Sequence, residues 1–462
     1  MFVRALPLCS LLLLWACSSS STDLAGVPAA GGSSTSAEAA AGSGAEAGNA
    51  PAPSVTYWQD ARPLLEEKCV GCHNGAGIAP FALDDFATAH QYATALAADT
   101  EARVMPPWPP GALSPPMLHD RSLTAEQIQL FADWASGGAL EGDPDAPAAV
   151  TPPELAVLPS VDVSADIGVD YVPPSDVKDE YRCFLLELGT TEDRVSLGYR
   201  VTPGNPKIVH HVITTLFDGS SVDALRALDD ETPDRAGWPC AGGPVPLAAE
   251  AKLKPVGALG SWVPGVSVVL YPNGTGARVP SGSVAVMQVH YNLDGEPGPD
   301  RTKIDVAFAA AGEEPAQNLS TLRIRNNRIR IPAGAKDVAV ETTMTATELA
   351  AGRFYPDGTA TLRMVAGHMH MVGVQTSLTL ERANGEKSVL LDIPAWDFHW
   401  QGSYTLATPI DLHADDKVTL RCVYDNTPEH LSAAGYPEPS HLVTLGEGST
   451  DEMCIGYLTV TD

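Results

Sequence analysis

Short segments in which apolar and polar residues alternate dominate the last two thirds of this chain. Examples are "YRCFLLEL", "KIVHHVITTLF", "VAVMQVHYN", "SVLLDI" and "KVTLRCVYD". This alternation is typical of strands that bury one face, and no helical period of useful length interrupts it. The residues from about 150 to 462, which begin with a proline-rich linker, are therefore expected to fold as antiparallel β-sandwiches, and their number is enough for two.

The first 54 residues have the composition of an export signal followed by a tether. Residues 1–17, "MFVRALPLCSLLLLWAC", hold one arginine and an apolar stretch that is too short to span a bilayer as a stable anchor. They resemble a bacterial lipoprotein signal peptide, which would place a lipid on Cys17; an ordinary secretory signal cut elsewhere is the alternative. Residues 18–54 are almost all small and predict a disordered tether. We therefore expect an exported bacterial protein, held to a membrane by lipid and facing the periplasm or the cell surface.

The chain is strongly acidic. Its 57 Asp and Glu residues outnumber its 28 Lys and Arg residues, which gives a formal net charge of -29. Nucleic acids and anionic membrane surfaces would repel such a chain. We therefore expect no nucleic-acid partner, and membrane contact only through the N-terminal lipid.

The eight cysteines divide into three groups. Cys9 leaves with the signal peptide and Cys17 would carry the lipid, whereas Cys69 and Cys72 lie in the sequence "KCVGCH". The other four remain in an oxidising compartment, where two disulfides are the usual outcome. Spacing alone does not choose among the three possible pairings of these four residues, which are Cys183, Cys240, Cys422 and Cys454.

The sequence "CVGCH" at residues 69–73 is the pattern at which c-type heme is attached. The thiols of Cys69 and Cys72 would bond to the heme, and the imidazole of His73 would bind its iron. A disulfide or a zinc-binding CxxC with a neighbouring histidine is the alternative.

Helical patterns surround this motif. An amphipathic helix is expected before it, and a capping box formed by Thr124 and Gln127 predicts a closing helix over residues 124–138. The segment from the motif to this helix resembles small bacterial cytochrome c domains. Residues 55–146 are therefore expected to be a small all-α, cytochrome c-like domain that holds one covalently attached heme c.

A cytochrome of this kind needs a second axial ligand for its iron. Met105 lies in "VMPPWPPG", where the prolines exclude a regular helix and stiffen the loop. A thioether ligand raises the reduction potential and suits electron transfer, so Met105 is the predicted ligand. Met117 and His119 are the alternatives.

Several histidines lie within the expected strands. His368 and His370, in "VAGHMHMVG", are two residues apart, and on a strand such residues point to the same face, where they can bind one metal ion. His210 and His211, in "KIVHHVITTLF", are adjacent. A regular strand would point them to opposite faces, so a shared metal requires a twist or bulge at this position.

Two further residues complete the pattern. His290 lies in "VMQVHYN" and Met453 in "TDEMCIGYLTV". Three imidazoles, or two imidazoles and a thioether, suit copper, because the nitrogens tolerate both oxidation states and the sulfur favours Cu(I). If each histidine is considered alone, the alternative to a metal ligand is an ordinary core or surface histidine.

As an ordered set, these motifs resemble the copper type II, ascorbate-dependent monooxygenases, the family of peptidylglycine alpha-hydroxylating monooxygenase and dopamine beta-hydroxylase. The motifs are HH, "QVHY", HxH and "DEMC", together with "YRC" at 181–183, "RCVYDNT" at 421–427 and "DEMCIGY" at 451–457. The likeness spans nearly all of residues 175–462 and fills all six copper-ligand positions.

The resemblance implies two jelly-roll-like β-sandwich domains, residues 175–315 and 316–462, which follow a linker at 147–174 and face each other across a cleft. It also implies two copper ions and two disulfides. The copper that stores electrons would be held by His210, His211 and His290, and the copper that binds oxygen beside the substrate by His368, His370 and Met453. The disulfides would be Cys183–Cys240 and Cys422–Cys454.

Members of this family insert one oxygen atom into a C–H bond and draw electrons from ascorbate. The resemblance therefore implies a monooxygenase that uses O2 and a small organic substrate, with an ascorbate-like reductant or a redox protein as electron donor. Because a heme domain is expected in the same chain, we hypothesise that the heme replaces or supplements ascorbate. It would feed the copper of His210, His211 and His290 one electron at a time.

The substrate-binding pattern of the peptide-acting members is not kept. They have an arginine two residues before the HxH pair, where this chain has Ala366, and an asparagine two residues after the methionine, where it has Ile455. A substrate that presents a peptide carboxylate is therefore not expected, and a more apolar or neutral substrate is.

Other residues are candidates for the surroundings of the second copper. Tyr457, which matches a family tyrosine and is a predicted catalytic residue, and Trp396 are candidate pocket residues, with core packing as the alternative for both. His399 and His441 lie close in sequence to the second ligand set and are candidate hydrogen-bond donors there.

Two other functions fit parts of the pattern. The chain could be a heme and copper electron-transfer or copper-binding lipoprotein without hydroxylase activity, which would act with a redox partner and form no product. It could also be an adhesion or carbohydrate-binding β-sandwich with an appended cytochrome, which would not require the six ligands.

Overall fold

The computed structural model describes residues 54–75, 79–150, 156–241, 243–245, 253, 255–263, 266, 268–293, 298–313, 317–350, 359–435, 439–446 and 448–461. The chain divides into two compact units, Met1–Ala52 and Pro53–Asp462, and all described residues lie in the second. The predicted signal peptide, with Cys17, and nearly all of the predicted tether lie outside the described residues. In the part of the chain that is described, no helix is both long and apolar enough to cross a membrane.

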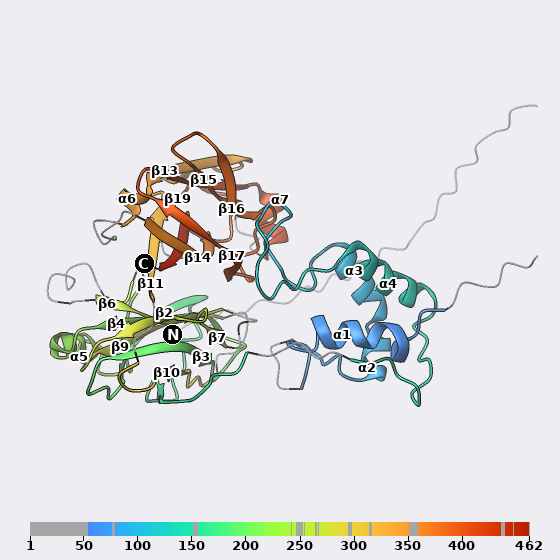
Figure 1. Cartoon of the computed structure of the whole chain (residues 1–462), viewed down its shortest axis with the longest axis horizontal. Helices are drawn as coiled ribbons and strands as arrows, with labels where there is room; N and C mark the ends of the chain where they lie inside the picture. Colours follow the sequence, from blue (N-terminus) through green and yellow to red (C-terminus); the bar gives the residue numbers. More distant parts are fainter. Residues whose placement is uncertain are drawn as a thin grey trace, which may run out of the picture. The chain divides into compact units, whose positions relative to one another are not determined.

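The described residues between 54 and 150 form a helical unit with its own apolar core. Tyr57, Leu65, Phe131 and Trp134 are at most 1% exposed in this core. Thr124 and Gln127 form the predicted capping box of α4, and this helix ends at Ser136, two residues before the end of the predicted range. The elements are the π-helical turn η1 (Tyr57–Ala61), α1 (Arg62–Lys68), α2 (Phe86–Gln91), α3 (Ala93–Glu101) and α4 (Ala125–Ser136) (Figure 1).

The first β-sandwich is coloured green to yellow in Figure 1. One sheet has the strand order β5-β2-β9-β4-β6, and the strands β1-β10-β3-β8, with β7 on β3, form the opposite layer. Phe184, Val212 and Met287 of the first layer share one core with Val201 and Val306 of the second. The elements are β1 (Val163–Asp166), β2 (Asp179–Glu187), β3 (Arg194–Thr202), β4 (Val209–Phe217), η2 (Gly219–Ser221), α5 (Val222–Asp230), β5 (Trp238–Pro239), β6 (Pro255–Trp262), β7 (Val269–Leu270), β8 (Thr275–Val279), β9 (Val284–Asn292) and β10 (Lys303–Phe308).

The second β-sandwich, orange to red in Figure 1, pairs the strands β13-β18-β15-β16 with the strands β11-β20-β14-β17. Leu378 and Leu420 of the former layer pack with Leu362 and Leu458 of the latter. The elements are β11 (Gln317–Arg325), β12 (Arg330–Ile331), β13 (Val338–Thr345), α6 (Ala346–Ala350), β14 (Thr359–His368), β15 (Gly373–Glu381), β16 (Lys387–Ile393), β17 (Ser403–His413), β18 (Lys417–Tyr424), α7 (Pro428–Ala433), β19 (Val443–Thr444) and β20 (Ile455–Thr461). The prediction of a mostly β-sheet protein with stacked sheets is therefore confirmed for the described residues.

The two sandwiches share one continuous sheet. Gln317 and Asn318, at the start of β11, pair in parallel with Thr275 and Gly276 of β8. The layer of the first sandwich that contains β8 and the layer of the second that contains β11 therefore join into one sheet of nine strands.

Residues 106–118, which we call the covering segment, run from the helical unit to two edge strands of the second sandwich. Gly111 N donates to Asp392 O on β16 at 2.7 Å, and Ser114 Oγ accepts from Asp392 N at 2.9 Å. On β17, Leu118 N donates to Thr405 O at 2.8 Å. The covering segment thus satisfies backbone groups that an edge strand leaves unpaired.

Apolar side chains of the covering segment also pack on the second sandwich. The Trp108 ring meets the Tyr404 ring edge-on, with centroids 5.4 Å apart. Met117 is 8% exposed and belongs to the core of the second sandwich. Met117 is therefore unsuited to the alternative role of heme ligand, because its thioether lies in another core.

Both disulfides implied by the family resemblance are present. Cys183 of β2 is bonded to Cys240, and Cys422 of β18 is bonded to Cys454, which immediately precedes β20. Cys69 and Cys72 are free thiols. The Cys422–Cys454 bond ties the two layers of the second sandwich together, directly beside Met453.

We expect the double variant Cys422→Ala/Cys454→Ala to lose about 3–4 kcal/mol of stability in the second sandwich, because the bond closes a long loop in the unfolded chain. Hydrogen exchange of β18 and β20, followed by mass spectrometry, measures the free energy of their opening. The variant Cys183→Ala/Cys240→Ala is the control and should leave exchange of β18 and β20 unchanged. Equal exchange in the wild type and the Cys422/Cys454 variant would contradict the expectation.

Candidate metal centres

Three histidines meet at one end of the five-stranded sheet of the first sandwich. His211 of β4 lies directly opposite His290 of β9. Between Val209 and His211 the register of this pair of strands shifts, so His210 lies at a bulge. The bulge that the adjacent histidines require is confirmed. It turns the His210 ring toward the side on which the other two rings lie, since one candidate ligand atom from each of the three residues lies within 4.8 Å of the other two.

The same nitrogen of each ring faces the centre of this group. His211 Nδ1 lies 3.4 Å from His210 Nδ1 and 3.3 Å from His290 Nδ1. Two nitrogens bound at about 2.0–2.1 Å to one ion, at a tetrahedral angle, are separated by about 3.3–3.4 Å. The separations of His211 Nδ1 from the other two Nδ1 atoms therefore match the spacing of ligands to a single metal ion.

A carboxylate fixes the third ring from behind. His290 Nε2 donates to Asp179 Oδ1 at 2.9 Å, which leaves Nδ1 unprotonated and directed at the centre. Asp179 also accepts from Asn292 Nδ2 at 2.8 Å and from Ser449 Oγ at 2.5 Å. Burial alone would raise the pKa of Asp179, but these hydrogen bonds hold it well below its usual range. Asp179 is thus an anion that links a ring of the first sandwich to a loop of the second.

Aromatic rings pack against the histidines of this group. The Tyr181 ring stacks on His290 with centroids 4.0 Å apart. Phe398, from the loop between β16 and β17 of the second sandwich, stacks on His210 at 4.5 Å. These rings restrict the imidazoles to one orientation.

The electrostatic surroundings keep the three imidazoles neutral. Burial, assisted by the nearby His290, lowers the pKa of His210 to about 2. Burial also lowers the pKa of His211 and that of His290, although Asp179 opposes the shift for His290. A neutral imidazole is the form that binds a metal ion, so this group is prepared for a cation without first releasing protons.

His368 and His370 lie at and just beyond the end of a strand. His368 is the last residue of β14 and pairs with Ile455 of β20. The prediction that one strand carries both rings is wrong for His370, because β14 ends before it. The rings nevertheless adjoin, with centroids 5.1 Å apart. Met369 between them is fully buried in the core.

Hydrogen bonds direct one nitrogen of each of these rings away from the pair. His368 Nδ1 donates to Gln401 Oε1 at 2.6 Å, and Gln401 Nε2 in turn donates to Phe398 O at 2.9 Å, which fixes the amide orientation. His370 Nδ1 donates to Asp451 O at 3.3 Å. Each Nε2 remains for a metal ion. Burial lowers the pKa of both residues, that of His370 to about 3.

Glu452 joins the chain segments that carry His370 and Met453. Its buried carboxyl group accepts from the backbone N–H of His370 at 2.9 Å and of Met453 at 3.0 Å. It also accepts from Val372 N at 2.7 Å and Gly373 N at 3.0 Å. Burial raises the pKa of Glu452 to about 8, while the four N–H donors act in the opposite direction.

Met453 itself lies between Glu452 and the disulfide at Cys454. Its carbonyl accepts from the Tyr424 hydroxyl at 2.9 Å, and its side chain is partly exposed. The backbone of Met453 is therefore fixed on both sides, by Glu452 and by Tyr424.

The remaining candidates have different surroundings. Trp396 is 8% exposed and its Nε1 donates to His370 O at 3.1 Å, so it supports the backbone of a predicted ligand. His399 is half exposed and its Nδ1 donates to Asp397 Oδ1 at 3.2 Å. The backbone carbonyl of His441 accepts from Asn426 Nδ2 at 2.7 Å.

Tyr457, Ala366 and Ile455 share one face with His368. Tyr457 pairs with Ala366, and Ile455 pairs with His368, in the register of β14 and β20. Directly paired residues point to the same side of a sheet. Their neighbours Leu458 and Val365 belong to the core, so Tyr457 and Ala366 point away from it.

Sequence reasoning missed Asp179, Gln401 and Glu452. Asp179 and Gln401 lie 111 and 33 residues from the histidines that they contact, so no local motif marks them. Glu452, in contrast, lies inside the motif "DEMC", which is part of the family resemblance. A signal was present there, because an acidic residue flanked by a methionine and a cysteine at the start of a buried strand has to find hydrogen-bond partners.

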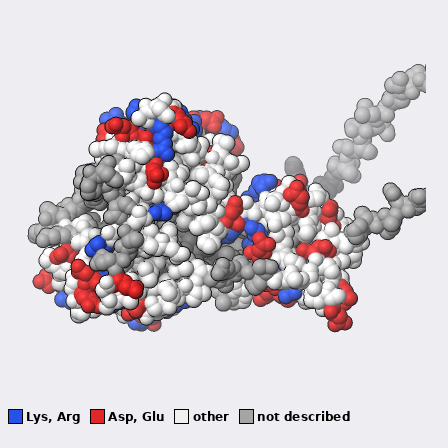
Figure 2. Space-filling model, viewed as in Figure 1, with Lys and Arg blue, Asp and Glu red and all other residues white. Residues whose placement is uncertain are grey.

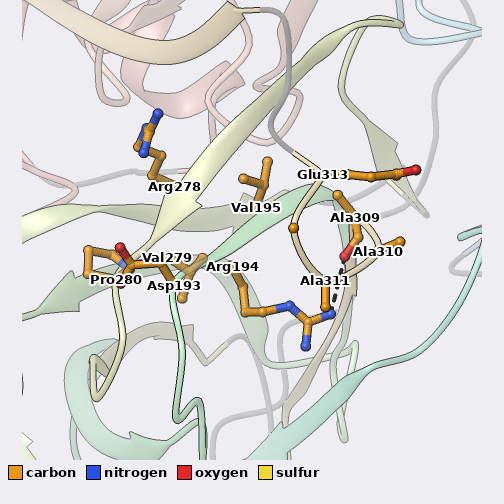
Figure 3. Close-up of a pocket in the computed structure, with 11 residues that line it drawn as sticks. Asp193, Arg194, Val195, Arg278, Val279, Pro280, Ala309, Ala310, Ala311 and Glu313 are labelled. Carbon is orange, nitrogen blue, oxygen red and sulfur yellow. Dashed lines mark hydrogen bonds between the residues drawn. The ribbon is translucent and has the colours of Figure 1, made fainter.

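A surface hollow of the first sandwich holds none of these residues. Figure 3 shows Arg194 within it, with Nη2 donating to Ala309 O at 3.2 Å. The hollow is formed by loop ends of β3, β8 and β10, and it offers no group of imidazoles. Its lining residues are Asp193, Arg194, Val195, Arg278, Val279, Pro280, Ala309, Ala310, Ala311, Gly312 and Glu313.

Part of the chain matches a known protein family. Residues 316–460 match the family model described as "Copper type II ascorbate-dependent monooxygenase, C-terminal domain". The second sandwich matches a copper monooxygenase domain. The match includes His368, His370 and Met453, and it supports a copper-binding oxidoreductase of the monooxygenase class in general terms.

Other comparisons add little. No curated protein matches the chain. Among solved structures, 64% of this chain aligns with 65% of PNGF-II at 10% identity and a TM-score of 0.22. Similarly, 63% aligns with 59% of the structure of infectious bursal disease virus Gx strain, at 11% identity and a TM-score of 0.18. The chain therefore spans less than two thirds of either protein, and TM-scores this low carry no argument about it.

We expect Glu452→Gln to weaken copper binding by His368, His370 and Met453 about 10- to 100-fold, because an amide accepts fewer of the four N–H bonds. The measurement is a copper titration against a chelator of known affinity, which should show one tight copper per chain in place of two. Glu341→Gln, at an exposed glutamate of β13, is the matched control and should retain both. Two tightly bound coppers in Glu452→Gln would show that Glu452 does not position these ligands.

Proposed function

We propose that this chain is a copper-dependent monooxygenase that hydroxylates a C–H bond of a small organic substrate with O2. The match of residues 316–460 supports copper monooxygenase activity in general. The observation that carries the fuller proposal is the convergence of three Nδ1 atoms in the first sandwich. That sandwich lies outside the matched residues, and it would supply the separate centre that a two-copper enzyme needs.

In this proposal, His210, His211 and His290 hold the electron-storing copper. Copper bound by His368, His370 and Met453 would supply open coordination positions at which O2 is activated beside the substrate. The chain's own contribution is positional. Asp179, Gln401 and the backbone held by Glu452 orient the rings, and burial keeps them neutral. Tyr457 lies on the face of the sheet that His368 shares, where it would contact the substrate.

The residues of the helical unit fit a c-type heme, and we include it in the proposal. His73 Nδ1 donates to Phe81 O at 3.1 Å, which leaves Nε2 for iron. Cys69 and Cys72 are free thiols in the turn that follows α1. Met105 is partly buried and lies just before the covering segment. When bound, the heme would supply one-electron transfer.

The heme would supply electrons to the copper centres in place of, or in addition to, an ascorbate-like reductant or a redox protein. The covering segment supports this role, because it connects the helical unit to the second sandwich through backbone hydrogen bonds. The N-terminal lipid on Cys17 would hold the protein to a membrane, with the folded part in the periplasm or at the cell surface.

The metal content of the full chain tests the proposal. The protein should be matured in a host that attaches c-type heme, loaded with copper and desalted. We expect one iron and two coppers per chain, measured by elemental analysis. One iron without tightly bound copper would overturn the copper assignment, and two coppers without iron would overturn the heme assignment alone.

A Cys69→Ala variant tests the electron supply. With copper retained, the variant should lose turnover that depends on a redox-protein donor, because the heme is no longer attached. Oxygen consumption in the presence of substrate and donor is the readout, and the copper content is measured in the same samples. Unchanged turnover would show that electrons reach copper without the heme.

A further inference from the structure

An arginine-rich stretch lies on the second sandwich of this acidic protein. The sequence "RIRNNRIR" places Arg323, Arg325, Arg328 and Arg330 within residues 323–330, in a chain of net charge -29. All four side chains are exposed. Figure 2 shows acidic and basic side chains interspersed over the face in view, whereas residues 323–330 contain no Asp or Glu.

Two of these arginines are aligned with His368 across the sheet. Arg325 of β11 pairs with Ile455 of β20, which pairs with His368 of β14. Arg323 pairs in the same way with Tyr457, which pairs with Ala366. Neighbouring strands are about 4.8 Å apart, so β11 and β14 are separated by about 9–10 Å.

The burial pattern fixes the side to which these residues point. Leu322 and Ile324 alternate with the two arginines along β11, and both belong to the core. Arg323 and Arg325 therefore project from the outer face, which His368 and Tyr457 share. Thr321 Oγ1 and Thr459 Oγ1, which lie 3.2 Å apart, continue the same face beyond Arg323.

Neither guanidinium has an acidic partner among the described residues. Ion pairs elsewhere in the second sandwich, such as Arg421 with Glu341 and Arg382 with Asp416, show the usual arrangement. The side chains of Arg323 and Arg325 make no ion pair or hydrogen bond within the described part of the chain. Their donors are free for an external anion, and a guanidinium fits a carboxylate well.

From this geometry we infer that Arg323 and Arg325 bind the anionic group of the substrate, which is a small organic acid with an apolar body. The inference rests on the proposed function and names its substrate class. The acid group binds at β11, the apolar body lies over Ile455, Ala366 and Tyr457, and the reacting carbon reaches His368. Position 366 on β14 is an uncharged alanine, and the positive charge comes instead from Arg323 and Arg325 on β11, two strands away.

The test uses full-length, copper-loaded protein and two probes, 4-phenylbutyrate and its neutral amide, 4-phenylbutyramide. Isothermal titration calorimetry should show that the acid binds about tenfold more tightly than the amide, because the arginines form charge-assisted hydrogen bonds with a carboxylate. Arg323→Ala/Arg325→Ala should abolish this preference. Arg328→Ala/Arg330→Ala removes the same charge beside the site and should retain it.

Three results would overturn the inference: equal binding of acid and amide by the wild type, no binding of either probe, or equal loss of preference in both double variants. The last result would show a general effect of positive charge. Copper content is measured in every sample. Wild-type protein that holds fewer than two coppers would refute the proposed function, whereas a failed preference with two coppers present would refute only the substrate class.

Discussion

The hydrogen bonds of the Asp179 carboxylate connect the two chain segments that carry the candidate centres. It accepts a hydrogen bond from His290 in the first sandwich and one from Ser449 in the second. A partly buried anion of this kind is costly when it loses hydrogen-bond partners. Without the second sandwich, Asp179 would keep its two partners on β9, His290 and Asn292, and lose Ser449. The loop that precedes Met453 is in turn held near the first centre.

The covering segment places a second constraint on the same region. It bonds to β16 and β17, the two strands that flank the loop carrying Phe398 and Gln401. Phe398 stacks on His210 and Gln401 orients His368, so one loop contacts both candidate centres. Fixing both ends of this loop restricts the positions available to Phe398 and Gln401. The helical unit thus contributes to the geometry of the metal ligands as well as to the proposed electron supply.

The sequence was most informative where local geometry decides the outcome. The adjacent histidines required a bulge, and β4 has one at His210. The capping box at Thr124 was predicted correctly, since it depends on residues three apart. By contrast, β14 ends at His368 because Glu452, a residue 82 positions from His370, turns the following backbone. Long-range contacts of this kind, including that of Asp179 with His290, leave no local pattern in the sequence.

The same distinction between local and long-range contacts bears on the substrate class. Along the chain, Ala366 removes the arginine expected before the HxH pair, and the sequence alone favours a neutral substrate. Across the sheet, the register brings Arg325 into line with His368, although 43 residues separate them in the sequence. A substrate contacts a surface rather than a sequence segment. Along the rows of paired residues, Arg325 is in line with His368 and Arg323 with Ala366, so two cations lie on the face that His368 shares.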